Sequence, residues 1–233
     1  MSELAAARAE VLERMAAACV RSGRAPDAAT LVAITKTWPL ERLRLIQAAG
    51  HDVLGENRVQ EAAAKIPSLG PSEWHLVGHL QKNKAAKAVE LFDVIESVDS
   101  TALAARLDRL AGERGTRSGG PLSVLLQVNV DEDPAKAGFV PAALQRELDR
   151  VLALPNLRVD GLMTVGFHTG GGDAARPTFA RLRELSTRLR AGDERLGPGL
   201  SMGMTDDFEV AIEEGSTLVR VGRALFGERP TSA

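Results

Sequence analysis

The sequence predicts a parallel α/β protein that closes into a single TIM (β/α)8 barrel with one extra N-terminal helix. Strand-like and helix-like segments alternate eight times, which implies a parallel sheet. The chain has 233 residues, an ordinary length for one such barrel, and 44% of them are hydrophobic, enough for one large core. Eight units also match the number that closes a barrel. A doubly wound open sheet is the alternative, because strands of this kind do not declare closure.

Residues 1–22 are expected to form a leading amphipathic helix that ends at Gly23 and Pro26. Its apolar residues recur at helical spacing, and they are Leu4, Val11, Leu12, Met15 and Cys19. The early acidic residues and the helical period argue against a signal or transit peptide. No apolar run approaches the roughly 18 residues that a membrane helix needs. We therefore expect residues 1–233 to be one barrel domain with this helix in front.

Eight short, mostly apolar strands follow in order. They are LVAITK (31–36), DVLGE (52–56), WHLVG (74–78), DVIESV (93–98), LSVLLQVNV (122–130), LRVDGLMTV (157–165), GLSMG (199–203) and TLVRVG (217–222). Proline, glycine and hydroxyl residues mark where helices begin and end between them. These helices are expected from Pro39 to Gly50, up to Pro67, over 81–91, after an N-cap at Ser100, from Pro141, over 174–190, from an N-cap at Thr205 to Gly215, and as a short turn after 222. The segments 114–120 and 168–173 are expected to be connections.

Charge and cysteine content restrict the partners. The net charge is −2, so the sequence lacks the Lys/Arg excess of a nucleic-acid-binding domain. Cys19 is the only cysteine, which excludes a disulfide framework and a thiolate metal cluster and fits a reducing compartment. His75 and His79 lie on a predicted strand, where four residues span roughly 13 Å, too far for one metal ion. We expect a cytoplasmic protein with neither nucleic acid, membrane nor metal as partner.

The first predicted strand ends on Lys36. Functional residues of such barrels lie at the carboxyl ends of the strands. An amine held near the barrel interior loses hydration, its pKa falls, and it becomes a nucleophile toward an aldehyde. The alternative is a solvated lysine at a strand end.

The loops after strands seven and eight resemble a phosphate-binding cup. TIM barrels often bind phosphate through these two loops. Here they are residues 201–204 and Gly222 with Arg223, where small residues let backbone N–H groups approach a phosphate and Ser201 adds a hydroxyl. Gly203 and Gly222 are ordinary turn residues in the alternative reading. A lysine opposite such a cup makes the combination more specific than either feature alone.

Arg220 lies two residues before Gly222, so both point to the same barrel face. Enzymes that use pyridoxal 5′-phosphate (PLP) place either an acid or an arginine against the pyridine nitrogen. An arginine gives up no proton in practice and would leave the ring a poor electron sink. The alternative is a surface arginine in a salt bridge.

Several motifs make the chain similar to the PLP homeostasis proteins, the YggS/PROSC family. They run in that family's order and cover nearly the whole chain after the first helix: AITKTWP (33–39), GENRVQE (55–61), WHLVGHLQKNK (74–84), LLQVNVDEDPAKAGF (125–139), GLMTV (161–165), ARPTFARLREL (175–185) and LSMGMTDDFEVAIEEGSTLVRVGRALFG (200–227). The resemblance implies a fold type III PLP-binding barrel like the N-terminal domain of alanine racemase, without its second β domain.

The resemblance also implies roles for single residues. Lys36 would hold PLP as a Schiff base, Asn57 would contact PLP near that lysine, and Met202 would touch the ring. The remaining implied roles are phosphate binding by Ser201 with backbone groups of Gly222 and Arg223, and Arg220 facing the pyridine nitrogen. Two departures stand out. Gly166 and Phe167 replace a frequent proline, and Arg223 replaces a frequent threonine, which leaves only its backbone N–H for phosphate.

The function implied is intracellular PLP homeostasis, meaning storage, buffering or delivery of PLP, without robust catalysis. PLP-dependent apoenzymes would be the recipients, and the protein would be a monomer. One alternative is a PLP-dependent racemase or decarboxylase of the alanine racemase type, with His79 as the best candidate for a second base. Another is a barrel enzyme for phosphorylated sugars, in which Lys36 would serve a different carbonyl.

Overall fold

The computed structural model describes residues 3–166 and 172–228, and within them eight parallel strands close into a barrel. The strands are β1 (Thr30–Ile34), β2 (Val53–Glu56), β3 (Glu73–Leu76), β4 (Val94–Val98), β5 (Leu122–Gln127), β6 (Leu157–Met163), β7 (Gly199–Ser201) and β8 (Leu218–Val221). Each strand pairs with the next, and β8 pairs with β1, placing Arg220 opposite Val32. The predicted TIM barrel is therefore confirmed, and the open sheet is excluded.

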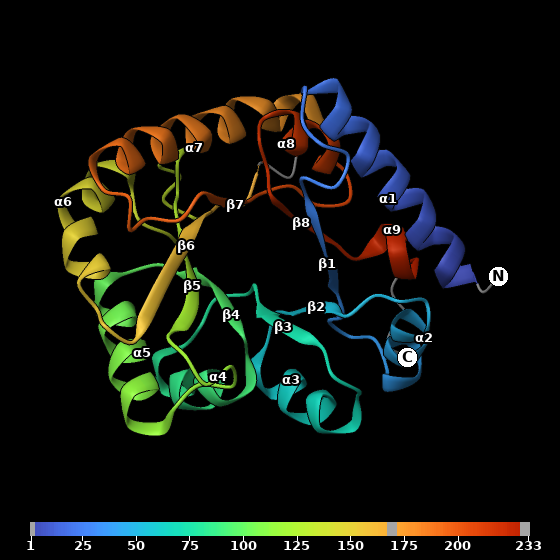
Figure 1. The fold of residues 1–233 in the computed structure, drawn as a ribbon, viewed down its shortest axis with the longest axis horizontal. Coiled ribbons are helices and arrows are strands. Elements are labelled where there is room, and N and C mark those ends of the chain that lie inside the picture. Colours follow the sequence, from blue (N-terminus) through green and yellow to red (C-terminus); the bar gives the residue numbers. More distant parts are fainter. Residues whose placement is uncertain (1–2, 167–171, 229–233) are drawn as a thin grey trace.

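Helices surround this barrel and cover its outer face (Figure 1). They are α1 (Glu3–Arg21), α2 (Leu40–Ala48), α3 (Val59–Lys65), α4 (Ala85–Leu91), α5 (Thr101–Arg114), α6 (Pro141–Leu152), α7 (Gly172–Gly192), α8 (Phe208–Glu213) and α9 (Arg223–Phe226). Two short 3-10 helices, η1 (Ile66–Ser68) and η2 (Lys82–Lys84), precede β3 and α4. Alternation along each strand sends one set of side chains toward the helices and the other into the barrel. In β1, Leu31 and Ala33 belong to the core under the helices, whereas Val32 and Ile34 do not.

The leading helix α1 packs against α8 and α9 and lies beside the segment that follows β8 (Figure 1). Its apolar stripe, which includes Leu4, Val11 and Met15, is buried. Arg14 forms an ion pair with Glu209 of α8 at 2.9 Å. The N-terminal helix thus supports the two barrel units in which the sequence places a phosphate-binding cup.

The structure moves several predicted boundaries. Strand five ends at Gln127 instead of residue 130, so Asn129 lies beyond it and bonds to loop carbonyls. Helix α8 begins after Asp207 rather than after Thr205, because the Asp207 carboxylate accepts the N–H of Met204 at 2.6 Å and completes the preceding turn. Helix α7 begins at Gly172, before the predicted residue 174. Of the predicted connection over 168–173, residues 168–171 lie outside the described part.

Candidate ligand-binding site

A cavity of about 420 Å³ opens at the carboxyl ends of the strands. This volume is within the range of small-molecule sites. The lining residues are Ile34, Lys36, Asn57, Val77, Met163, Val165, Met204, Thr205, Asp206, Arg220, Gly222 and Arg223. A second cavity, of about 380 Å³, shares Ile34, Lys36, Gly222 and Arg223 with it. Five of the seven predicted site residues therefore meet at one place, namely Lys36, Asn57, Arg220, Gly222 and Arg223.

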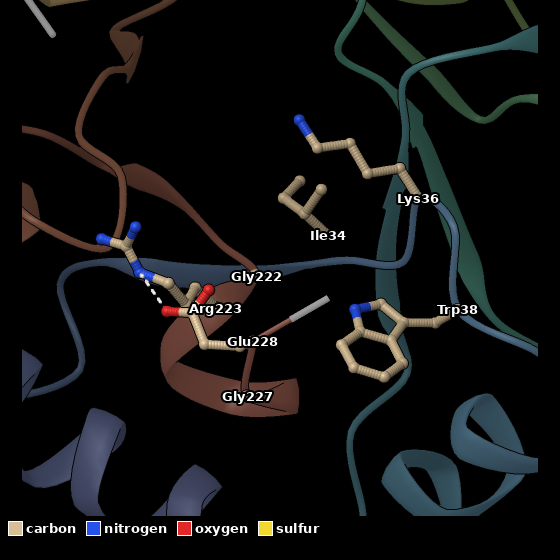
Figure 2. A pocket seen from close by; sticks show the side chains of 7 residues that line it. All are labelled: Ile34, Lys36, Trp38, Gly222, Arg223, Gly227 and Glu228. Carbon is tan, nitrogen blue, oxygen red and sulfur yellow. Dashed lines mark ion pairs between the residues drawn. The ribbon is translucent and has the colours of Figure 1, made fainter. Parts of the chain in front are cut away.

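Lys36 lies two residues beyond the end of β1 and is half-buried. Figure 2 shows Lys36 and Trp38 on one side of the second cavity, Arg223 and Glu228 on the other, and Ile34 between them. Trp38 stacks on Phe226 with ring centroids 5.6 Å apart. The aromatic pair thus forms a rigid wall next to the lysine.

A strained turn presents Lys36 to the cavity. Thr37 has a φ of 68°, a left-handed conformation that is unfavourable for a β-branched residue. Its N–H donates to Glu61 Oε2 at 3.0 Å. Before the turn, Lys65 Nζ donates to the carbonyl of Thr35 at 2.8 Å. Two side chains of α3, Glu61 and Lys65, therefore bind the backbone on either side of Lys36.

Lys65 also forms a buried ion pair with Glu56 at 2.5 Å. Thr35 Oγ1 donates to the same carboxylate oxygen at 2.7 Å. Burial raises the pKa of Glu56 above its ordinary value, although the bonds from Lys65 and Thr35 oppose the shift. Lys65 thus stabilises the backbone next to Lys36. The sequence analysis did not identify this second lysine.

Arg220 forms the buried floor of the first cavity. Its side chain is only 4% exposed. Nη1 donates to Ser201 Oγ at 2.5 Å, and Nη2 donates to the carbonyl of Thr164 at 2.8 Å. Burial lowers the pKa of Arg220, while the negative charges of Glu96 and Asp207 oppose that shift. The alternative of a surface arginine in a salt bridge is wrong.

The barrel interior beneath Arg220 contains a charged pair that the sequence analysis did not identify. His75 Nδ1 lies 2.6 Å from Glu96 Oε1, and its Nε2 lies 2.9 Å from Glu73 Oε1. Burial would lower the pKa of His75, but the bonds to Glu73 and Glu96 outweigh it and raise the pKa to about 9. The sequence carried one signal for this pair, namely Glu96 inside the apolar run DVIESV. A buried carboxylate is too costly to occur without a partner, so Glu96 required one.

Ser201 and Met202 are fully buried and do not line either cavity at Lys36. The Ser201 hydroxyl donates to Glu96 Oε2 at 2.5 Å and accepts from Arg220. Its oxygen is therefore bound to two side chains of the barrel interior. The predicted roles of Ser201 toward phosphate and of Met202 toward a ring stay predictions.

Asn57, Gly222 and Arg223 border the mouth of the cavity. Asn57 lies against Gly78, so closely that a Cβ on this glycine would be 2.3 Å from the Asn57 carbonyl oxygen. The Arg223 side chain forms ion pairs with Asp206 and Glu228, which line the first and the second cavity. The expectation that only the backbone of Arg223 serves a phosphate stays a prediction.

His79, the candidate second base, lies in a different place. Its imidazole is 60% exposed and pairs with Asp99 at 3.1 Å. It lines a separate cavity with Asn57 and Lys84. Across the described residues, no group of three or more His, Cys, Asp or Glu side chains could hold a metal ion.

Fold and site together define a (β/α)8 barrel protein with a cavity at the carboxyl ends of its strands. Lys36 and the buried Arg220 both line this cavity. The family described as "Alanine racemase, N-terminal domain" matches residues 14–230. A pyridoxal phosphate homeostasis protein of Pseudomonas aeruginosa is 41% identical over 235 residues, covering 100% of this chain and 99% of the other. Its counterpart in Aquifex aeolicus is 41% identical over 221 residues, covering 94% and 95%. The chain belongs to the family of pyridoxal phosphate homeostasis proteins.

Solved structures agree with this assignment. PipY of Synechococcus elongatus PCC7942, solved with PLP bound, is 42% identical with a TM-score of 0.80, covering 93% of this chain and 100% of the other. Alanine racemase of Clostridium difficile shares the fold, with a TM-score of 0.70 at 12% identity. The match covers 88% of this chain but only 54% of that racemase. The described helices include none long and apolar enough to cross a membrane.

Proposed function

We propose that this protein binds PLP as a Schiff base on Lys36 and acts in intracellular PLP homeostasis by storing, buffering or delivering it. The observation that carries the proposal is the cavity in which Lys36, Asn57, Arg220 and the Gly222–Arg223 backbone meet. PipY, the relative solved with PLP, supports the same ligand. The proposal treats residues 1–233 as one PLP-binding unit.

The chemistry of the cavity suits PLP. Ile34, Val77 and Met163 provide apolar walls for an aromatic ring. Cationic groups and backbone N–H donors suit the anionic phosphate and the ring substituents. When bound, PLP supplies an aldehyde that condenses with an amine.

Each part of the chain has a defined task in this proposal. The turn at Thr37 directs the Lys36 amine into the cavity, and the Trp38 side chain forms one wall beside it. Arg220 donates hydrogen bonds to the deeply buried ring end, and Asn57 contacts PLP near Lys36. Phosphate meets the backbone N–H groups of Gly222 and Arg223, two residues that line both cavities at Lys36.

The finer parts of the proposal concern the cell. We propose that the protein is cytoplasmic, works as a monomer and passes PLP to PLP-dependent apoenzymes without robust catalysis of its own. The relatives from Aquifex aeolicus and Pseudomonas aeruginosa are named as homeostasis proteins and not as enzymes, which supports this role.

The first prediction tests Lys36. The purified protein should be yellow and saturable with PLP, whereas Lys36→Ala should lose the visible absorbance of the Schiff base. Absorbance titration and borohydride reduction followed by peptide mass spectrometry measure both. Lys87→Met is the matched control, because it removes an exposed lysine that pairs with Glu90 and lines neither cavity at Lys36, and it should keep an adduct on Lys36. An adduct of unchanged stoichiometry in Lys36→Ala would contradict the proposal.

A further inference from the structure

A continuous chain of hydrogen bonds runs through the barrel interior from its mouth to its base. It begins at Arg220 in the cavity and passes through Ser201 to Glu96. From Glu96 it continues through His75 to Glu73, whose side chain is 53% exposed at the opposite end. Strands β8, β7, β4 and β3 each contribute a link, and every inner link is fully buried.

Among the described residues of this hydrogen-bond series, Ser201 connects Arg220 to Glu96. The guanidinium lies 3.9 Å from the Glu96 carboxylate, too far for a hydrogen bond. The hydroxyl fills that gap, because it accepts from Arg220 and donates to Glu96, both at 2.5 Å. A hydroxyl can donate only one proton, so this arrangement fixes its direction.

The arrangement also fixes the guanidinium. Ser201 accepts from Nη1 and Thr164 accepts from Nη2, which defines the plane of the group. An arginine carries five N–H donors, so others remain for a ligand in the cavity. Arg220 lies on β8, two residues before Gly222 at its end, and is therefore deeper in the barrel than the predicted phosphate contacts. Arg220 is therefore placed to contact the part of a ligand that is buried most deeply.

We propose that Ser201, held by the Glu96–His75 pair, is a positioning residue that orients Arg220 toward the ring end of the bound ligand instead of contacting its phosphate. This inference rests on the proposed function, since it assumes PLP in the cavity. It assigns a task to Glu96 and His75, which the proposed function leaves unused. It also explains why the Ser201 hydroxyl points into the barrel.

Ligand pairs that differ only in the phosphate separate the two roles of Ser201. Dissociation constants for PLP and for unphosphorylated pyridoxal are measured with the wild-type chain, Ser201→Ala and Ser123→Ala. Ser123 is the matched control, because it is a buried interior serine that donates to another carboxylate, Asp160. Ser201→Ala should weaken both ligands by a similar factor of about ten, the size expected for a hydrogen bond to a charged group. Ser123→Ala should leave both constants nearly unchanged.

A second measurement excludes a merely structural effect. The ¹⁵N chemical shift of the ring nitrogen in bound, labelled PLP should change in Ser201→Ala and stay constant in Ser123→Ala. If Ser201 acts through Arg220, then Ser201→Ala should cause little further loss in an Arg220→Met background. Should Ser201→Ala not fold, Ser201→Cys keeps the shape of the side chain at a slightly larger volume, weakens both hydrogen bonds and must give the same pattern.

The outcomes are distinct. A loss confined to PLP, with pyridoxal unaffected, would show that Ser201 serves the phosphate and would overturn the inference. Equal behaviour of Ser201→Ala and Ser123→Ala would overturn it as well. No saturable PLP binding by the wild-type chain would instead refute the proposed function itself.

Discussion

His75 and Glu96 place opposite charges in the buried interior of the barrel. Moving a charge out of water costs several kcal/mol, and only a close partner offsets this. Here each charge has two partners: His75 faces Glu73 and Glu96, and Glu96 faces His75 and Ser201. The pair is therefore stable only as a complete network, and removing one member leaves an uncompensated charge.

The protonation of His75 predicts a pH dependence of stability. The ordinary pKa of 6.5 applies to the unfolded chain, and the folded pKa is about 9. The folded state therefore holds the proton more tightly, and the stabilisation is complete below about pH 6.5 and is lost as the pH rises through about 9. We expect the free energy of unfolding to fall over this window by on the order of a few kcal/mol.

Urea unfolding between pH 6 and 10 measures this slope. His75→Gln should flatten it, because the variant has no proton to lose. His79→Gln is the control, since His79 is mostly exposed, and it should keep the wild-type slope. An NMR titration that placed the pKa of His75 at or below 6.5 would contradict the prediction.

Single positions differ in how far the sequence reveals them. Lys36 could be identified because it ends an apolar strand, and Arg220 because it shares a face with Gly222. The strained turn at Thr37 and the support from Lys65 could not, because they depend on contacts with α3. Ser201 illustrates the same limit: its partner Glu96 lies 105 positions away, and no local pattern joins the two.

Loops after β2 and β3 pack against each other at the barrel mouth, and this contact positions Asn57. Gly78 approaches the Asn57 backbone so closely that a Cβ would lie 2.8 Å from its Cα and 2.3 Å from its carbonyl oxygen. Ser97 of β4 reinforces the loop by donating to the Gly78 carbonyl at 2.7 Å. The two loops therefore behave as one unit, in which a small change on one side moves a predicted PLP contact on the other.

Gly78→Ala tests this unit. The added methyl group must push Asn57 away, so we expect PLP affinity to fall several-fold and stability to fall by about 1–3 kcal/mol. Titration with PLP and urea unfolding measure the two effects. Gly120→Ala is the matched control, because its Cβ would meet nothing within 4 Å. Wild-type affinity in Gly78→Ala would show that the position of Asn57 does not matter for binding.

Periodicity predicted the order of these elements because each strand carries its own apolar run and each helix its own breakers. Two of the boundaries that moved are fixed by loop side chains, and one of them is the start of α8, where Asp207 binds the Met204 N–H. Strand five shows the same effect: its pattern continues to residue 130, but Asn129 bonds to the carbonyls of Asp133 and Lys136 and leaves the ladder.

Within the described residues the eight strands form a closed ring, and α1 packs against α8 and α9 of its last two units. Arg24, just after α1, donates to the carbonyls of Ile212 and Ser216 and to that of Ala28. It thereby joins the end of the leading helix to α8 and to the start of β1. The residues that line the cavity lie on these strands or on the segments that follow them. The alanine racemase that shares the fold extends well beyond the part that matches this chain.

This architecture predicts that the PLP-loaded protein has no substantial racemase activity. Racemisation by two opposed bases needs an acid–base group on each face of the substrate. Lys36 can serve one face, but the sequence contains no tyrosine for the other, and Cys19 is buried in α1. His79 pairs with Asp99 and lines a different cavity from Lys36. In the proposed binding mode Arg220 faces the ring nitrogen, where its charge would disfavour proton uptake and leave the ring a poor electron acceptor.

The assay incubates PLP-loaded protein with L-alanine and other amino acids and follows the enantiomers by chiral chromatography. We expect no multiple turnovers at ordinary enzyme rates, on the order of 1 s⁻¹ or faster. Lys36→Ala sets the background, because it removes the amine that is proposed to hold PLP. Turnover at such rates that disappears in His79→Ala would mean that the mouth rearranges to bring His79 over the ligand, and the protein would then be an enzyme rather than a PLP carrier.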